Sequence, residues 1–245
     1  MAKNQSPIRP AQSCILTISP MGQKTILTPI QRRFLDLVQA ENYLTRKYYW
    51  TGGTVLSEIY LHHRDSEDID LFTDKGEIHL PSIKDFIGMS GAKLGAKGIS
   101  YTRFLGLHTF VFGFPDDSQL KVDFNYYPFP RINTSKKWGK IAIDSVEDIA
   151  VNKVHTISVK PRSRDFIDLY FLLKDKKWEL SLPRLISLAK IKFDWDINPL
   201  QMGENLAKVV TVKDLPRMLV PFDQKEMENY LLRLAKSLES DIFEN

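Results

Sequence analysis

The sequence has a single cysteine, Cys14, among its 245 residues. This excludes an internal disulfide framework, and a lone thiol is compatible with a reducing compartment. No stretch approaches the roughly 18 uninterrupted apolar residues that a membrane-spanning helix needs. The first residues, MAKNQSPIRPAQS, also lack the apolar core of a secretory signal. We therefore expect a cytoplasmic protein that has no membrane partner.

The formal net charge of the chain is also small, at +4. Such a balance neither requires nor excludes a phosphate-bearing partner. Basic residues gather in two segments, the first with Lys136, Lys137 and Lys140 around Trp138, the second with Lys160, Arg162 and Arg164. Most runs of this kind are solvated faces. The alternative is a nucleic-acid surface that attracts the phosphate backbone and stacks a base on Trp138.

Hydrophobic periodicity predicts an α+β fold whose two halves differ in character. In the first half we expect helices over 28–46, 54–63 and 82–97, and strands over 48–50, 68–72, 101–105, 109–114 and 120–126. The second half reads as helices only, over 145–158, 162–173, 183–190, 203–210 and 224–239. The predicted organisation is an N-terminal core with a small mixed sheet, residues 1–143, followed by a helical region, residues 144–245, that packs on it.

The run Gly52-Gly53-Thr54 lies where an aromatic strand is expected to enter a helix. Two glycines at this point let backbone amides approach a phosphate closely, and Thr54 can add a hydroxyl donor at the helix N-terminus. A lone Gly-Gly pair is more often a simple turn. Arg64, which follows this helix, either reaches the same phosphate or supports the turn before the next strand.

Asp68 and Asp70 are two residues apart in a predicted strand, so they share one face while Ile69 and Leu71 face the core. Two crowded carboxylates repel each other unless a cation such as Mg²⁺ lies between them. The same alternation places Lys121 and Asp123 on one face of a later strand. If the two strands are neighbours, Asp123 completes a two-metal site. The alternatives are a solvated Asp-x-Asp pair and a surface Lys–Asp pair.

Four ordered segments resemble the AbiEii/AbiGii-type nucleotidyltransferases of the DNA polymerase beta-like superfamily. They are GGTVL at 52–56, HRDSEDIDLF at 63–72, NKVH at 152–155 and RDFIDLY at 164–170. The resemblance covers roughly residues 28–175 and rests on all four segments together. It is therefore more specific than any single short motif.

The resemblance implies a role for each matched residue. Gly52, Gly53 and Thr54 would hold a nucleoside triphosphate, and Asp68 and Asp70 would ligate Mg²⁺ with Asp123 as the third acid. Two ions are expected, with Mn²⁺ as a substitute. Lys153 would contact the nucleotide, and Asp165 would be an acid needed for activity. The matched segment leaves Asp165 and Asp168 as alternatives for that acid.

The expected activity is transfer of a nucleoside monophosphate from an NTP to an acceptor, with release of pyrophosphate. By resemblance, the acceptor is tRNA and the protein is a toxin with an antitoxin encoded by a neighbouring gene. Two alternatives remain open. The acceptor is a small molecule or a protein side chain, or the chain is an inactive nucleotide-binding regulatory module.

Overall fold

The structure is a computed structural model that describes residues 25–133 and 136–243. Cys14 and most of the lead-in segment lie outside these residues. One sheet organises the first half, and its strand order is β3-β4-β5-β2-β1-β7-β6. The strands are β1 (Tyr49–Thr51), β2 (Asp68–Thr73), β3 (Gly98–Phe104), β4 (Leu107–Gly113), β5 (Gln119–Tyr126), β6 (Lys136–Trp138) and β7 (Ile141–Ile143). The β2–β5 and β1–β7 pairs are parallel and the other pairs are antiparallel, which confirms the predicted mixed sheet.

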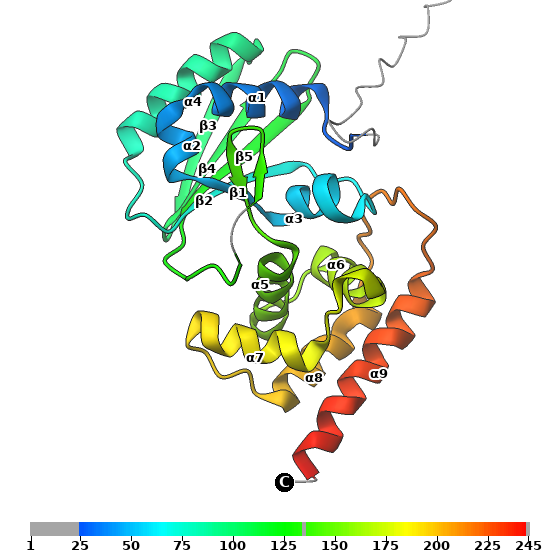
Figure 1. Ribbon diagram of the computed structural model, residues 1–245. Helices are drawn as coiled ribbons and strands as arrows, with labels where there is room; N and C mark the ends of the chain where they lie inside the picture. The colour runs from blue at the N-terminus through cyan, green and yellow to red at the C-terminus, as the bar shows by residue number, and fades with distance from the viewer. Residues whose placement is uncertain (1–24, 134–135, 244–245) are drawn as a thin grey trace, which may run out of the picture.

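Three helices lie on one side of this sheet: α1 (Pro29–Ala40), α2 (Asn42–Lys47) and α4 (Leu80–Leu94) (Figure 1). The N-terminus of α1 is fixed by a capping box in which Thr28 and Gln31 bond each other's backbone amides. Phe34 of α1 packs edge-on against Phe86 and Phe112, with ring centroids 5.8 and 5.7 Å apart. The helix predicted over 28–46 is two helices that meet at Glu41.

Helical elements make up the rest of the described chain. A short segment after β1 consists of α3 (Gly52–Val55) and the π-helix η1 (Leu56–Leu61). The second half contains α5 (Val146–Val159), α6 (Ser163–Lys174), η2 (Lys176–Trp178), α7 (Leu182–Phe193), α8 (Pro199–Ala207), η3 (Lys208–Thr211) and α9 (Gln224–Phe243). Helix α5 begins where predicted, because Ser145 accepts a hydrogen bond of 2.9 Å from the Asp148 amide. Strands β6 and β7 were not predicted.

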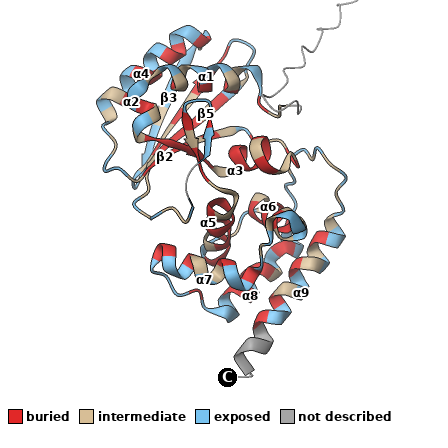
Figure 2. Ribbon diagram, viewed as in Figure 1, coloured by how far each residue is buried: buried red, intermediate tan, exposed pale blue. Residues whose placement is uncertain are grey.

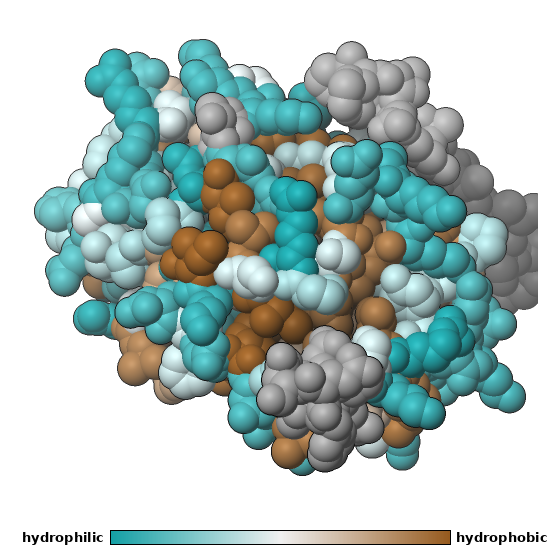
Figure 3. Space-filling view, turned by 60° about the horizontal axis from the view of Figure 1, so that its bottom comes forward, coloured by the Kyte–Doolittle hydropathy of each residue, from teal (hydrophilic) through white to brown (hydrophobic). Residues whose placement is uncertain are grey.

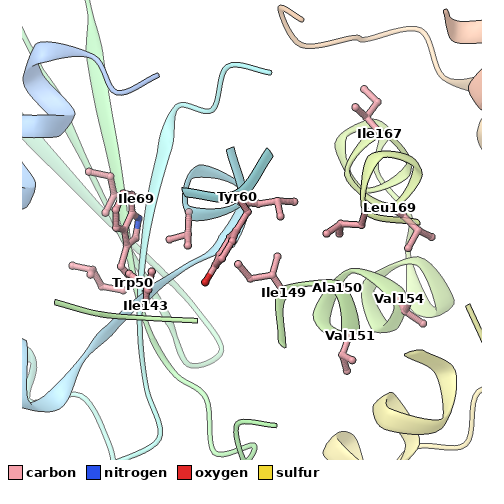
Figure 4. Packing of buried hydrophobic residues seen from close by; sticks show 14 of the residues in the cluster. Trp50, Tyr60, Ile69, Ile143, Ile149, Ala150, Val151, Val154, Ile167 and Leu169 are labelled. Atoms are coloured by element: carbon pink, nitrogen blue, oxygen red, sulfur yellow. The ribbon is translucent and has the colours of Figure 1, made fainter. Parts of the chain in front are cut away.

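One continuous set of buried apolar side chains joins the sheet to the helices. Buried positions continue from the sheet through α3 and into α5 (Figure 2). Tyr60 of η1 lies between the sheet residues Trp50 and Ile143 and the helical residue Ile149 (Figure 4). Its hydroxyl donates to the Asp144 carbonyl oxygen at 2.8 Å. The division at residue 143 stays a prediction.

The face at the helical end of the molecule is partly apolar. Brown side chains gather toward its middle and hydrophilic ones surround them (Figure 3). None of the described helices is both long and apolar enough to cross a membrane. The cytoplasmic location stays a prediction.

Candidate active site

A cleft of about 380 Å³ lies between the sheet and helices α5 and α6. Its sheet side is formed by the end of β1, the start of α3, and strands β2 and β5. Its helical side includes Asn152, Lys153 and Thr156 of α5, and Arg162 and Arg164 border its mouth. Among the residues predicted from the sequence, it brings together Gly52, Gly53, Arg64, Asp68, Asp70, Asp123 and Lys153.

The acids reach this cleft through the expected strand alternation. In β2, Ile69 and Leu71 are fully buried, whereas Asp68 and Asp70 are only half-buried and line the cleft. Strand β5 lies beside β2 in parallel, and its register places Lys121 opposite Asp68 and Asp123 opposite Asp70. The predicted adjacency of the two strands and the shared face of the three acids are confirmed.

The start of β2 is held rigidly from two sides. The Thr54 hydroxyl donates to the Asp68 carbonyl oxygen and is also hydrogen-bonded to the Ser66 hydroxyl, at 2.9 Å. The Gln31 amide donates to the carbonyl oxygens of Ser66 and Glu67, each at 2.9 Å. The sequence predicts a Thr54 hydroxyl that faces a bound phosphate. Thr54 is instead fully buried, and its hydroxyl does not face the cleft. Its position instead orients the strand that carries the acids.

Asp70 is the least compensated carboxylate of the three. Burial, together with the neighbouring charges of Asp123 and Asp68, raises its pKa to about 7. Within the described residues, no donor or cation bonds its carboxylate. Asp68 and Asp123 instead share the Lys121 ammonium, whose Nζ lies 3.1 and 2.9 Å from their oxygens. Asp123 also accepts a hydrogen bond of 2.6 Å from the Thr109 hydroxyl.

These side chains do not form a ready-made metal site. In the parts of the chain that the structure describes, no three His, Cys, Asp or Glu residues are arranged to hold an ion. In the cleft, the Lys121 ammonium lies where Asp68 and Asp123 would otherwise share a cation. The donor chemistry nevertheless fits a hard divalent ion, because an unpaired carboxylate lies between two others and all three ligand groups are oxygens. A bound ion would require Lys121 to turn away.

Gly52 shows why glycine is needed beside the acids. Its φ of +82° is unfavourable for a residue with a side chain, and an added Cβ would overlap Oδ2 of Asp70. A Cβ on Gly53 would lie 2.7 Å from Nη2 of Arg64. The backbone at 52–53 therefore meets the acid cluster directly, with no side chain between them.

A buried polar network supports the cleft from behind, and Asp168 is its centre. The carboxylate accepts two hydrogen bonds from Arg64, at 2.7 and 2.8 Å, and lies 2.8 Å from Nε2 of His63. Lys153 Nζ lies 2.6 Å from Asp168 and 2.8 Å from Asp165. Burial acts to raise the pKa of Asp168, but Lys153 and Arg64 outweigh it and hold that pKa well below its usual range.

Asp165 and Asp168, the two alternatives for the acid of the matched segment, both belong to this network. Both Asp165 and Asp168 have fully buried side chains and both bond Lys153, so neither acid faces the cleft itself. Asp165 also accepts a hydrogen bond of 2.9 Å from Arg162 at the cleft mouth. Arg64 is 1 % exposed and donates to Asp168 and to the Asp65 carbonyl oxygen, which favours the supporting role over phosphate contact.

The two basic segments differ in their surroundings. Trp138 is 8 % exposed, lies edge-on to Trp50 and has the Arg32 guanidinium over its face, so the alternative in which it stacks on a base is excluded. Arg162 and Arg164, in contrast, line the cleft, and Arg164 lies 4.0 Å from Asp68.

The sequence profile of the family described as "Nucleotidyl transferase AbiEii toxin, Type IV TA system" matches residues 37–241. The chain belongs to the AbiEii nucleotidyltransferase family. The match continues past residue 175, where the resemblance to the four sequence segments ends, and it includes the C-terminal helices α7, α8 and most of α9.

Individual relatives agree with this family and fold. An uncharacterized protein of Aquifex aeolicus (strain VF5) is 30% identical over 170 residues, which cover 68% of this chain and 77% of that protein. The crystal structure of JHP933 from Helicobacter pylori has a TM-score of 0.55 at 18% identity, covering 88% of this chain and 91% of that one. A second Helicobacter pylori crystal structure has a TM-score of 0.56 at 19% identity, covering 89% and 98%. These likenesses confirm the predicted α+β fold, in which a mixed sheet is followed by helices.

Other residues of this AbiEii-family cleft carried no predicted role. Asn125 follows Lys121 and Asp123 on the same face of β5, so the alternation of that strand could have identified it. At the other end of the cleft, Tyr127 packs on Phe72 and Phe129 with ring centroids 5.2 and 4.9 Å apart. His155 also lines this end. No sequence signal marks these rings as cleft residues, because Tyr127 and Phe129 follow the end of β5.

Proposed function

We propose that the chain is a Mg²⁺-dependent nucleotidyltransferase that moves a nucleoside monophosphate from an NTP to RNA, with tRNA as the acceptor. One observation carries the proposal. Asp68, Asp70 and Asp123 face a side-chain-free backbone at Gly52 and Gly53 within a single cleft. Transfer of a charged phosphoryl centre needs this combination of cation-binding oxygens and a close backbone cradle.

The three acids are the proposed ligands of Mg²⁺ or Mn²⁺, with one ion held by Asp68 and Asp70 and a second shared with Asp123. When bound, the ions neutralise charge on the triphosphate and on the attacking oxygen. Lys121 leaves the acid pair in this state and offers its ammonium to a phosphate oxygen nearby. The backbone at Gly52 and Gly53 accommodates the β- and γ-phosphates.

The reaction is a displacement at the α-phosphorus. The acceptor hydroxyl oxygen forms a bond to the α-phosphorus, and the bond from that phosphorus to the α,β-bridging oxygen breaks. The electron pair of that bond leaves with pyrophosphate, and the hydroxyl proton is released through Asp123 to solvent. Lys153 stabilises phosphate charge, and Asp165 and Asp168 fix its ammonium in position.

The other residues that line the cleft can contact the base of the nucleotide and the acceptor. Tyr127, Phe129 and His155 form an aromatic end of the cleft where a base can stack. Arg162 and Arg164, with side chains 61% and 42% exposed, lie at the mouth and can contact the backbone of an RNA acceptor. The family description as a toxin of a type IV toxin–antitoxin system supports an antitoxin partner.

The direct test uses the purified chain with each α-labelled NTP in turn, total tRNA and Mg²⁺. We expect label in tRNA, none in EDTA, and none with Asp70→Asn. Asp117→Asn is the matched control, because that carboxylate is 91% exposed and pairs with Lys97 on the surface. Label that enters small molecules or proteins instead of RNA would reject the proposed acceptor and keep the chemistry.

A further inference from the structure

The tip of the β3–β4 hairpin is unusually apolar for a surface turn. Phe104 is 75% exposed and Leu105 is 80% exposed, which makes them two of the three most exposed large apolar side chains in the described residues. They are neighbours in sequence. Adjacent exposed apolar side chains of this size are a frequent mark of an interaction site.

Strand pairing places Phe104 on the same face as the acids. Phe104 lies opposite Leu107, Leu107 lies opposite Asn125, and Asn125 lies opposite Phe72. Directly paired residues project from the same side of a sheet. Leu107, Asn125 and Phe72 line the cleft, so Phe104 continues its floor outward to the edge strand.

The backbone of the tip is fixed in a conformation that its sequence does not favour. Leu105 has a φ of +52°, a region that residues with a side chain rarely adopt. The Arg103 guanidinium donates to the Leu105 carbonyl oxygen at 3.2 Å and holds the turn. The two-residue hairpin turn between Phe104 and Leu107 accounts for the positive φ of Leu105, but not for an exposed leucine at a position that glycine or asparagine usually fills. Strain of this kind gathers at ligand-binding sites.

The position of the phosphate cradle determines the side from which an acceptor must approach. Gly52 and Gly53 follow β1, on one side of Asp70, whereas Asp123 lies on the other side, toward β4 and β3. The attacking and leaving oxygens are roughly in line across the reacting phosphorus. If pyrophosphate leaves toward the glycines, the acceptor arrives over β5, β4 and β3.

The open sheet surface along this path leads to Phe104. From strand spacing, Phe104 lies about 12 Å from Asp123, two strands across and two residues along. The cleft-facing residues of β3, Ser100, Thr102 and Phe104, are all exposed. An extended strand can therefore lie along this surface while its end reaches Asp123. A small-molecule acceptor would not need it.

We propose that Phe104 and Leu105 form a stacking platform for an unpaired base of a polynucleotide acceptor whose 3′ end enters the cleft. Exposed aromatic rings stack bases without reading sequence. This inference rests on the proposed function and identifies the acceptor as a single-stranded RNA end.

Steady-state kinetics with the acceptor that wild type labels tests this platform. Phe104→Ala is expected to raise the KM for RNA about tenfold, because stacking on one ring accounts for a loss of this order. The KM for NTP should not change, and Phe104→Trp should restore RNA binding. Ile191→Ala is the matched control, because Ile191 is 76% exposed on α7 and lies outside the cleft. An unchanged KM for RNA in Phe104→Ala would overturn the platform and leave the proposed function intact.

A binding assay without NTP separates the two proposals if wild type labels no RNA. Fluorescence anisotropy with a short fluorescein-labelled single-stranded RNA should show weaker binding by Phe104→Ala than by wild type or Ile191→Ala. Equal binding by all three, or no binding by wild type, would overturn the platform. Gel filtration identifies the competing occupant: a dimer that Phe104→Ala converts to a monomer would assign the tip to a second copy of the chain instead.

Discussion

Asp70 of β2 and Asp123 of β5 lie directly opposite each other on adjacent parallel strands, and both face the cleft. Asp123 has the Lys121 ammonium and the Thr109 hydroxyl as partners, whereas Asp70 has none among the described residues. The pair is therefore a site of unbalanced negative charge that the fold tolerates. Such an arrangement lowers stability and is retained where a function depends on it.

Substitution of Gly52 should abolish activity because of a steric clash with Asp70, and a control glycine separates this clash from backbone strain. Gly52→Ala introduces a Cβ that overlaps Asp70, so we expect at least a hundredfold loss of transfer activity. Gly76→Ala is the control, because Gly76 has a similar φ of +86° but nothing within 4 Å of an added Cβ. It should cost only about 1 kcal/mol of stability and leave activity unchanged. Equal losses of activity in both variants would show that backbone strain, not the contact with Asp70, is responsible.

Lys121 should compete with the divalent ion for the acids. Lys121→Met removes the cation shared by Asp68 and Asp123, so the metal-free protein should unfold at a temperature lower by about 2–5 °C. Mg²⁺ should bind the variant several-fold more tightly in calorimetric titration, because no ammonium has to be displaced. Lys97→Met, which removes a surface partner of Asp117, should change neither quantity. Weaker Mg²⁺ binding by Lys121→Met would contradict the competition.

The two acids of α6 should differ in their contribution to stability. Asp168→Asn leaves Arg64 and Lys153 without their shared buried carboxylate, and we expect a loss of about 3–5 kcal/mol of unfolding free energy. Asp165→Asn should cost less, since Lys153 keeps Asp168 and Arg162 is 61% exposed and can be hydrated. Urea unfolding of both variants measures the difference. A larger loss for Asp165→Asn would contradict the assignment of Asp168 as the centre of the network.

The sequence was sufficient for the sheet face that carries the chemistry. Strict alternation in Asp68–Phe72 and around Asp123 predicts which side chains share a face, and the helix caps at Thr28 and Ser145 were correctly placed. The sequence was insufficient where contacts between distant segments decide whether a segment forms a strand or a side chain is buried. Strands β6 and β7 have three residues each, too few to show a period, and they are strands only because β7 pairs with β1 and β6 pairs with β7. Thr54 and Trp138 were misplaced because burial by distant segments leaves no local signal.

Asp144 should make stability depend on pH in a direction that can be predicted. Burial raises its pKa from 3.8 to about 6, and the Thr51 hydroxyl only partly opposes this. The folded chain thus keeps a proton that the unfolded chain has released, so this contribution to stability is present below about pH 4 and is lost as pH rises through 6. Asp144→Asn should stabilise the protein by about 1–3 kcal/mol at about pH 8 and by almost nothing at about pH 4. Calorimetric melting temperatures that differ equally at both pH values would contradict this.

Under the proposed function, the Asp70 carboxylate belongs to the centre that transfers the nucleotide, and its uncompensated charge lowers the stability of the fold. The most direct measurement combines Mg²⁺-dependent transfer from α-labelled NTP with the melting temperature in EDTA, for wild type and Asp70→Asn. We predict a loss of transfer of at least a thousandfold, together with a melting temperature higher by about 2–5 °C, because a repelling charge is removed. An Asp70→Asn protein that transfers nucleotide at the wild-type rate would contradict the account.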